Sequence, residues 1–427
     1  MLSRLVLIKG ALLCASAWLA APSYASDINF DFSGSYRLRY ETLQNPIFPT
    51  DASTRSRSND RISSRVLLKG QAKWEHWNAT VEIQDSRAFL DDNDPSLTSS
   101  QVNTLEPLQF FLRYSDVNEY VKSVTVGRMT LDHGSRRLLA RGVYRNTQNA
   151  FDGITVDTEY QKWAIRGFYL LPVSRLPSAS ALIEDNERAF DKSYSERKIF
   201  GFYATSPEKA WNLHSYWFKE SDGADLATRN RDLYTLAAEY STTIGNGWKA
   251  NAELIGQTGT TRQTTAADDM TDLDVRAWMA HGHIGRKVND STFLRAEIDY
   301  ASGDNNSDDD TVHSPDSLYG VRRFDFGPTD VYQGFRRSNI IAPGLRSVTK
   351  VDKHEVMVGY KAVWYDKVEA GADDFMGQQL EVRWRYKALP DLRLEFGGAY
   401  LHKGDALEAG DYADDSQFAY TAFLYSF

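Results

Sequence analysis

The feature that most constrains this chain is a strict alternation over residues 28–41, which read I-N-F-D-F-S-G-S-Y-R-L-R-Y-E. The even positions carry apolar, aromatic or small side chains, whereas every odd position is polar. A period of two gives a β-strand with one apolar and one wet face. This strand is about twice as long as a typical soluble strand, and large apolar side chains begin and end its apolar face. The pattern therefore predicts a strand that crosses a lipid bilayer.

The same alternation recurs along the chain, separated by connections that are short and long in turn. After the polar residues 42–60, residues 61–75 alternate again and turn sharply at 76–78. Residues 161–162 and the Asn-Gly pair within 242–247 are typical of hairpin turns, and Asp-rich loops separate the hairpins. Short periplasmic turns and long outer loops are typical of bacterial outer-membrane barrels.

The strand count needs one strand that the alternation does not reveal. About seventeen strands can be read directly, but bacterial barrels have an even number. We predict the missing strand at residues 339–350, with Pro343 at a bulge or strand end. The chain is therefore expected to form an all-β, transmembrane antiparallel barrel of about 18 strands. The first strand should pair antiparallel with the last, which ends at Phe427.

The N-terminus predicts export from the cytoplasm. Residues 1–25 combine Arg4 and Lys9, an apolar run and a small-x-small site, as a secretory signal peptide does. We expect residues 26–427 to form one barrel domain in the outer membrane of a Gram-negative bacterium, inserted by the barrel-assembly machinery among lipid and lipopolysaccharide. The only cysteine, Cys14, lies in the signal peptide, which excludes thiol catalysis, Cys metal sites and disulfides in the mature chain.

Charge is distributed unevenly between the loops and the expected inner face. The net charge of −9 argues against nucleic acid as a partner. The polar face of the strands nevertheless holds more basic than acidic residues, so the excess acid lies in the loops and the channel wall should be positive. Such a wall attracts anions, and guanidinium groups can hold carboxylates bidentately. The wall residues expected to contact substrate are Arg37, Arg39, Arg65, Lys69, Arg295, Arg383 and Arg385. An alternative remains open for each arginine, namely a cross-strand ion pair that only stiffens the wall.

The stretch 127–153 interrupts the alternation and is the most arginine-dense part of the chain. Arg128 shares parity with apolar Val124 and Val126, so either a bulge falls near Gly127 or Arg128 lies at the rim. Basic residues among otherwise acidic outer loops predict a loop that folds inward and constricts the pore.

Two groups of motifs resemble the alginate-export family of outer-membrane proteins. They are G-R-x-x-L-x-x-G-x-R-R-L at 127–138, followed by R-N-T and F-D-G, and Q-D-S-R at 84–87. The resemblance implies an eighteen-stranded barrel with an arginine-rich pore that passes an acidic polysaccharide. It also implies that Arg128, Arg137 and Arg145 are lumen or constriction residues.

Other candidate sites are weaker. Asp304, Asn306 and Asp308 alternate as calcium ligands do but lack the Gly and distal Glu of an EF-hand, so a solvated loop is favoured and no cofactor is expected. His281 and His283 share a face without a third ligand in view, which favours two polar lumen residues over a metal site.

The leading functional hypothesis is passive, charge-selective passage of anionic oligo- or polysaccharide, such as alginate. The alternatives are a general anion or small-solute porin, and an outer-membrane barrel enzyme whose only candidate group is His133 beside Asp132. No recognisable serine elbow supports catalysis, so we do not expect an enzyme. A monomer is favoured. The direction of transport is not fixed, because a passive pore follows the gradient.

Overall fold

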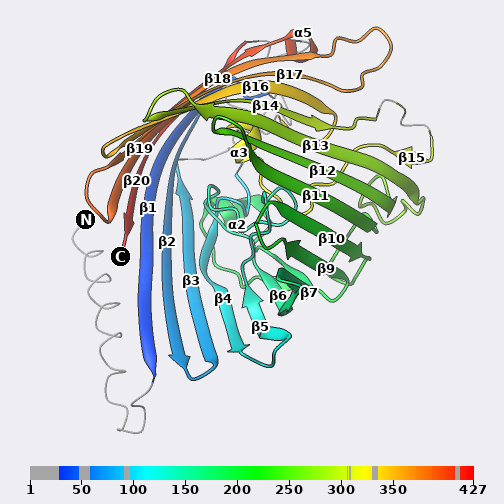
Figure 1. Cartoon of the computed structure of the whole chain (residues 1–427). Coiled ribbons are helices and arrows are strands. Elements are labelled where there is room, and N and C mark those ends of the chain that lie inside the picture. Colours follow the sequence, from blue (N-terminus) through cyan, green and yellow to red (C-terminus); the bar gives the residue numbers. More distant parts are fainter. Residues whose placement is uncertain are drawn as a thin grey trace.

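Eighteen strands close into one antiparallel barrel in the computed structural model, which describes residues 28–47, 58–90, 97–304, 306, 309–328, 335–408 and 414–427. Figure 1 shows the long strands running around the barrel, with β1 beside β20. The described chain also contains β8 and β15, which have two residues each and lie in loops. The expected signal peptide, residues 1–25, lies outside the described residues. No described helix is long and apolar enough to cross a membrane.

The barrel wall is made by strands of 9 to 17 residues. In chain order these are β1 (Asn29–Gln44), β2 (Ser58–Trp74), β3 (Trp77–Phe89), β4 (Asn103–Ser115), β5 (Val121–Met129), β6 (Phe151–Tyr160), β7 (Trp163–Ser174), β9 (Arg197–Thr205), β10 (Trp211–Glu220), β11 (Asp232–Ile244), β12 (Trp248–Thr261), β13 (Leu273–Lys287), β14 (Thr292–Ala301), β16 (Ile340–Val351), β17 (His354–Trp364), β18 (Phe375–Lys387), β19 (Leu392–Lys403) and β20 (Ser416–Ser426). The loop elements are α2 (Ser180–Glu184), β8 (Lys192–Ser193), β15 (Thr311–Val312), α3 (Arg323–Phe326) and α5 (Asp405–Glu408).

The first and last strands pair as predicted. In the antiparallel register of β1 and β20, Tyr36 lies opposite Tyr425 and Leu38 opposite Phe423. Their rings and side chains share the apolar outer face, where Phe32 of β1 is 78% exposed. Because the outer face of every strand meets lipid, exposed apolar side chains are stable there and would not be in water.

Connections alternate between tight turns and long loops, which confirms the predicted rhythm. Residues 75–76 join β2 to β3, and residues 161–162 join β6 to β7. Glu75, Gln161 and Lys162 have positive φ, the backbone that two-residue hairpins require. All the long connections emerge at the opposite end of the barrel, so the tight turns mark the periplasmic end.

The predicted extra strand is β16, and the structure shows how it tolerates Pro343. On the β14 side the register is continuous, with Pro343 opposite Ile298. On the β17 side the pairing is interrupted between Ile341 and Gly344. Proline has no backbone N–H, so it fits a strand where the neighbouring ladder is broken.

Two outer connections fold into the barrel and bond to each other. The first is the inner loop, residues 130–150, and the second is the described part of the β15–β16 connection, residues 313–328 and 335–339. The backbone N–H of Tyr319 donates to the carbonyl of Leu138 at 3.0 Å, and the N–H of Ala140 donates to the carbonyl of Tyr319 at 3.2 Å. A Cβ at Gly320 would lie 1.8 Å from the carbonyl oxygen of Arg137, so only glycine permits this approach.

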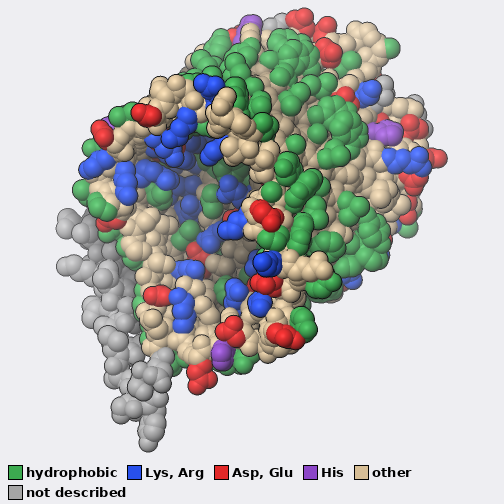
Figure 2. Space-filling model, viewed as in Figure 1, with side chains coloured by type: hydrophobic (Ala, Val, Ile, Leu, Met, Phe, Trp, Pro, Cys, Tyr) green, Lys and Arg blue, Asp and Glu red, His purple; other side chains and the backbone are tan. Residues whose placement is uncertain are grey.

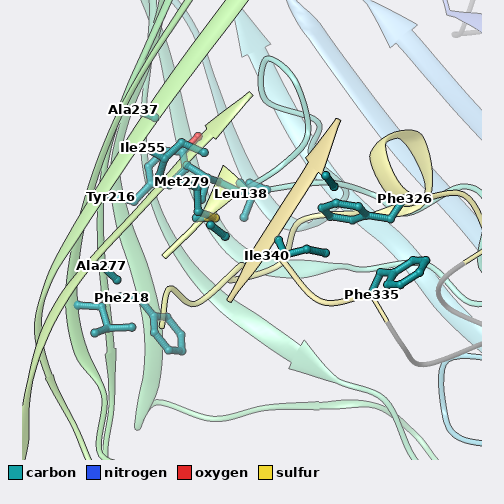
Figure 3. Close-up of a cluster of buried hydrophobic side chains, with 14 of the residues drawn as sticks. Leu138, Tyr216, Phe218, Ala237, Ile255, Ala277, Met279, Phe326, Phe335 and Ile340 are labelled. Carbon is teal, nitrogen blue, oxygen red and sulfur yellow. The ribbon is translucent and has the colours of Figure 1, made fainter. Parts of the chain in front are cut away.

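A hydrophobic core therefore lies inside the barrel, against one side of the wall. Figure 3 shows Tyr216, Ile255 and Met279 of β10, β12 and β13 close to Leu138 of the inner loop. Phe326 and Phe335 of the second connection belong to the same buried cluster. The alternation of the sequence predicts a polar inner face throughout, but the wall is apolar where the two loops cover it. One open part of the lumen lies on the other side, against β1, β2, β14 and β16 to β20.

One substitution tests the close strand packing of this side. We expect Gly259→Ala to destabilise the barrel by about 3 kcal/mol, because Gly259 has φ +138° and an added Cβ would lie 1.9 Å from the carbonyl oxygen of Asp232. Gly256→Ala in the same strand is the control, since nothing lies within 4 Å of its Cβ position. Urea unfolding in detergent, followed by heat-modifiable gel migration, measures both. Equal midpoints would contradict the prediction.

Candidate functional site

The open part of the lumen begins with a basic chamber at the periplasmic end. Its volume is about 630 Å³, and Ser35 of β1 and Ser426 of β20 mark its mouth. Figure 2 shows Lys and Arg side chains gathered around a hollow in this face of the molecule. Among the described residues, ten arginines line the chamber and Glu395 is the only carboxylate that does. The ten are Arg37, Arg39, Arg65, Arg141, Arg295, Arg323, Arg346, Arg383, Arg385 and Arg393.

A second basic chamber, of about 450 Å³, lies at the outer end. Its described lining contains six arginines and one carboxylate, that of Asp316. All seven lie in the outer connections and none in a strand. The six are Arg145, Arg229, Arg231, Arg322, Arg336 and Arg337.

A narrow neck lies between the chambers. Its cavity is only about 10 Å³, which is about the space that one water molecule needs. Its lining shares Val143, Tyr144, Arg323 and Phe324 with the periplasmic chamber and Arg145 with the outer one. The neck is lined by the two inward-folded connections, and its lining includes Arg136 and residues 142–145 of the stretch where the sequence predicts a constriction.

Three wall arginines hold the tip of the inner loop through its backbone. Arg37 Nη1 donates to the carbonyl of Tyr144 at 2.9 Å and Arg37 Nη2 to that of Arg145 at 3.0 Å. Arg65 Nη1 donates to the carbonyls of Val143 and Arg145 at 3.0 and 2.9 Å. Arg39 donates to the carbonyl of Tyr144 at 3.1 Å and also pairs with Glu41 at 3.0 Å. Since carbonyl oxygens carry no net charge, the charges of Arg37 and Arg65 remain available to the chamber.

Tyr144 at the loop tip is enclosed by cations. The guanidinium of Arg39 lies 4.7 Å from its ring centroid, and that of Arg323, from α3, lies 4.6 Å away. Arg323 in turn pairs with Glu381 of β18. Cation–π contacts that are shielded from water are worth about 2 kcal/mol, so Tyr144 links the β1 wall to α3 across the neck.

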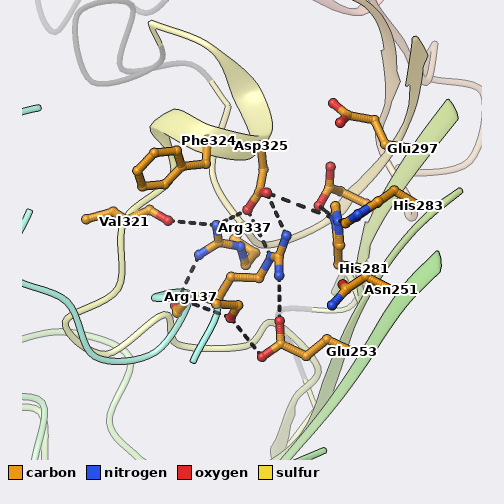
Figure 4. A network of polar contacts seen from close by, with 12 residues as sticks. Arg137, Asn251, Glu253, His281, His283, Glu297, Val321, Phe324, Asp325 and Arg337 are labelled. Atoms are coloured by element: carbon orange, nitrogen blue, oxygen red, sulfur yellow. Dashed lines mark hydrogen bonds and ion pairs between the residues drawn. The ribbon is translucent and has the colours of Figure 1, made fainter. Parts of the chain in front are cut away.

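Arg137 is a buried anchor of the constriction (Figure 4). Its Nε and Nη2 bind Asp325 of α3 at 3.0 and 2.8 Å, and its Nη1 binds Glu253 of β12 at 2.6 Å. Arg337 also binds Asp325, at 2.6 Å. Burial alone would raise the pKa of Asp325, but Arg137 and Arg337 hold that pKa well below its ordinary value. The side chain fixes both loops to the wall, and its charge is balanced by carboxylates.

Arg128 lies at the rim, away from the three cavities. It pairs with Asp152 at 2.8 Å and with Glu106 at 2.8 Å. No register shift occurs at Gly127, so the rim placement that the broken alternation allows is the correct one. Lys69 is half-buried on the inward parity of β2 and lines none of the described cavities.

The remaining predicted arginines share carboxylates in the chamber wall. Arg295 and Arg346 both bind Glu297, at 2.7 and 2.8 Å. Arg383 and Arg385 both bind Glu355, at 3.2 Å each. Each of these two carboxylates pairs with two arginines. The chamber therefore keeps a net positive charge although its arginines form ion pairs.

The sequence patterns do not predict the loop arginines of the second connection. Arg322, Arg323, Arg336 and Arg337 line the neck or the chambers, yet they fall in a segment without strand periodicity. Their Arg-Arg pairs repeat the Arg136-Arg137 pair of the inner loop, which is the signal that could have identified them.

Potential cation ligands in the lumen are already bound to basic side chains. His281, Asp299 and Asp325 offer ligand atoms within 4.8 Å of one another, so His281 has neighbours that the sequence did not reveal. However, Lys361 Nζ lies 2.5 Å from Asp299 Oδ2, and Asp325 binds two arginines. In the outer loop, the Asp304 carboxylate accepts the backbone N–H groups of Asn306 and His313; Asp308 lies outside the described residues.

His133 serves packing within the inner loop. It is 1% exposed, hydrogen-bonds Tyr216 at 2.8 Å and stacks on Tyr203 at a centroid distance of 4.8 Å. The neighbouring Asp132 carboxylate accepts the backbone N–H of Arg141 at 2.9 Å. The His-Asp proximity in sequence therefore does not form an accessible acid–base pair.

We expect Arg137→Gln to loosen the constriction. Removing one partner of a buried ion network costs about 3–5 kcal/mol, so the two loops should detach part of the time and the mean single-channel conductance should rise. Arg276→Gln is the control, because its pair with Asp274 is exposed. An unchanged conductance with unchanged current noise would contradict the anchoring role of Arg137.

Acidification should weaken docking of the inner loop. Burial, with help from Arg166 and His214, lowers the pKa of His133 to about 3. An undocked His133 would take up a proton near its ordinary pKa, so docking is fully stable above that value and is lost as pH falls toward 3. At pH 5 the free energy that holds the inner loop in place is smaller by about 2 kcal/mol. We expect the backbone amide of His133 to exchange faster at pH 5 than at pH 7.5, after correction for intrinsic rates. This difference should disappear in His133→Gln. A difference that persists in the variant would contradict the role of His133.

The fold resembles several solved structures of porin-like barrels. Pseudomonas aeruginosa OccK9 (OpdG) has a TM-score of 0.62 at 12% identity, covering 93% of this chain and 98% of that chain. The outer membrane protein opdK of the same organism gives 0.60 at 12%, covering 93% and 99%. P. aeruginosa OccK2 (OpdF), solved in complex with glucuronate, gives 0.58 at 12%, covering 93% and 98%. No curated protein matches the chain.

Residues 28–420, nearly the whole described chain, match the family described as "Alginate export". With the closed barrel and its outer-membrane structural neighbours, the match places the protein in the outer membrane of a Gram-negative bacterium as a porin-like transport barrel. The chain therefore belongs to the alginate export family.

Proposed function

We propose that the barrel selects anions and passes carboxylated sugars by passive diffusion. The observation that carries this proposal is the excess of arginine over carboxylate in both chambers. Among the described residues, ten arginines and one carboxylate line the periplasmic chamber, and six arginines and one carboxylate line the outer one. The carboxylates that pair with the ten arginines from outside the lining are fewer than the arginines; they are Glu41, Glu82, Glu297, Glu355 and Glu381. The excess occurs in a chain whose net charge is −9, so a uniformly basic protein does not explain it.

The placement of these charges supports selectivity. Charges on the rim of a pore are screened beyond about 8 Å at physiological salt. The chamber arginines instead face a confined lumen with low-dielectric walls, which focus the field along the passage. A solute must also pass the neck beside Arg136, Arg145 and Arg323, so charge acts where the path is narrowest.

Uronic acids fit this arrangement as substrates. Each sugar unit has one carboxylate, which a guanidinium can bind bidentately, and hydroxyl groups that the polar wall can hydrogen-bond. OccK2 was solved in complex with glucuronate. That ligand belongs to OccK2, because at 12% identity its likeness to this chain concerns the fold alone. Oligouronates such as alginate fragments are our proposed substrate, and their passage requires the two loops to move apart at the neck. If the loops stay in place, the barrel is the alternative, a small-anion porin.

Reversal potentials across a KCl gradient test anion selectivity. We expect chloride to permeate better than potassium, and Arg383→Gln/Arg385→Gln/Arg393→Gln to lower the permeability ratio several-fold because three charges leave the chamber. The matched variant with lysine at all three positions keeps the charges and should keep the ratio. A cation-selective wild-type pore would refute the proposal.

Liposome swelling separates the two substrate classes. Proteoliposomes should swell faster in oligouronates than in neutral oligosaccharides of equal size if the pore serves acidic saccharides. Swelling with monosaccharide acids alone would assign the barrel to small anions.

A further inference from the structure

One sector of the periplasmic chamber is apolar, although it faces the aqueous lumen. Phe293 of β14 lies opposite Val348 of β16, and Val348 lies opposite Met357 of β17. All three line the chamber. They form a continuous row across three adjacent strands, which we call the apolar shelf.

Arginines border the shelf on both sides. One position further along the inner face of β14 and β16, Arg295 and Arg346 lie opposite each other. On β18, Arg383 lies opposite Met357. All three arginines also line the chamber. An apolar surface about three side chains wide is thus framed by guanidinium groups.

The framing arginines keep a net positive charge. Arg295 and Arg346 share Glu297, which also lies 3.4 Å from Lys361, and Arg383 shares Glu355 with Arg385. Each of these carboxylates therefore neutralises only part of the positive charge that it contacts. The shelf rim therefore favours an anion.

The shelf differs from the apolar wall behind the inner loop. There, Tyr216, Ile255 and Met279 are buried by the folded connections, so their apolar character has a packing cause. Phe293 and Val348 belong to none of the buried clusters and are only half-buried, whereas Met357, which is 2% exposed, is the covered end of the row. Exposed apolar side chains in a water-filled pore gain nothing from packing, whereas a solute with an apolar face would bury them.

We propose that the shelf is a binding site for a carboxylate with an apolar body, such as an aromatic acid. The ring lies over Phe293 and Val348, and the carboxylate accepts hydrogen bonds from Arg295, Arg346 or Arg383. This site rests on the proposed anion pathway and adds a second class of carboxylate to its substrates, because sugar acids without a broad apolar face gain less from it.

Current block by benzoate tests the shelf. In planar bilayers, we expect benzoate to reduce the KCl conductance at a concentration about tenfold lower than acetate or glucuronate does, because all three carry one carboxylate and only benzoate adds an aromatic face. The variant Phe293→Gln/Val348→Thr should remove this difference. The reversal potential of the same membranes should remain unchanged, since every chamber arginine is retained.

Leu424→Thr provides the matched control, since Leu424 of β20 lines the same chamber outside the shelf. It should leave benzoate block intact. Equal block by the three acids in the wild type, or block that survives the double variant, would overturn the shelf. Each result is independent of the sign of the reversal potential, which alone tests the anion pathway.

Discussion

The constriction depends on one buried ion network, in which Arg137 joins Asp325 to Glu253. Its three side chains come from the inner loop, from α3 and from the wall strand β12. Placing charges in a dry interior costs several kcal/mol for each ion unless pairing and hydrogen bonds compensate. Here the bidentate contact and the additional Arg337 provide that compensation. The network joins both connections to the wall at one point, and the contacts of Arg37 and Arg65 hold the tip of the inner loop at another.

Sequence periodicity could predict the barrel because the bilayer imposes it. The outward faces of β1 and β20 must be apolar at every second residue, so their pairing could be expected before the structure was known. Even β16 could be predicted, because an even number of strands required one more strand in that part of the chain. The inward face obeys no such uniform rule. Ile255 and Met279 face inward and are apolar because loops distant in sequence cover them, and periodicity in one strand contains no information about that cover. A signal existed in strands such as β11 and β13, where both faces carry apolar residues.

The predicted site likewise has a part that the sequence predicts and a part that depends on distant loops. Arg37, Arg39 and Arg65 do line the chamber, but their additional role in holding carbonyls of residues 143–145 depends on a loop about a hundred residues away. Arg128 and Arg137, chosen by motif resemblance, are fully engaged with carboxylates. A motif identifies residues that matter, whereas only the three-dimensional contacts separate those that hold the loops from those that present charge.

The contact between the inner loop and the second connection joins distant parts of the chain. Arg137 and Asp325 are 188 residues apart. Closing a loop of that length costs conformational entropy, which the ion network must offset. The width of the passage is thus set by a contact between two loops, whereas the wall is closed by the pairing of strands.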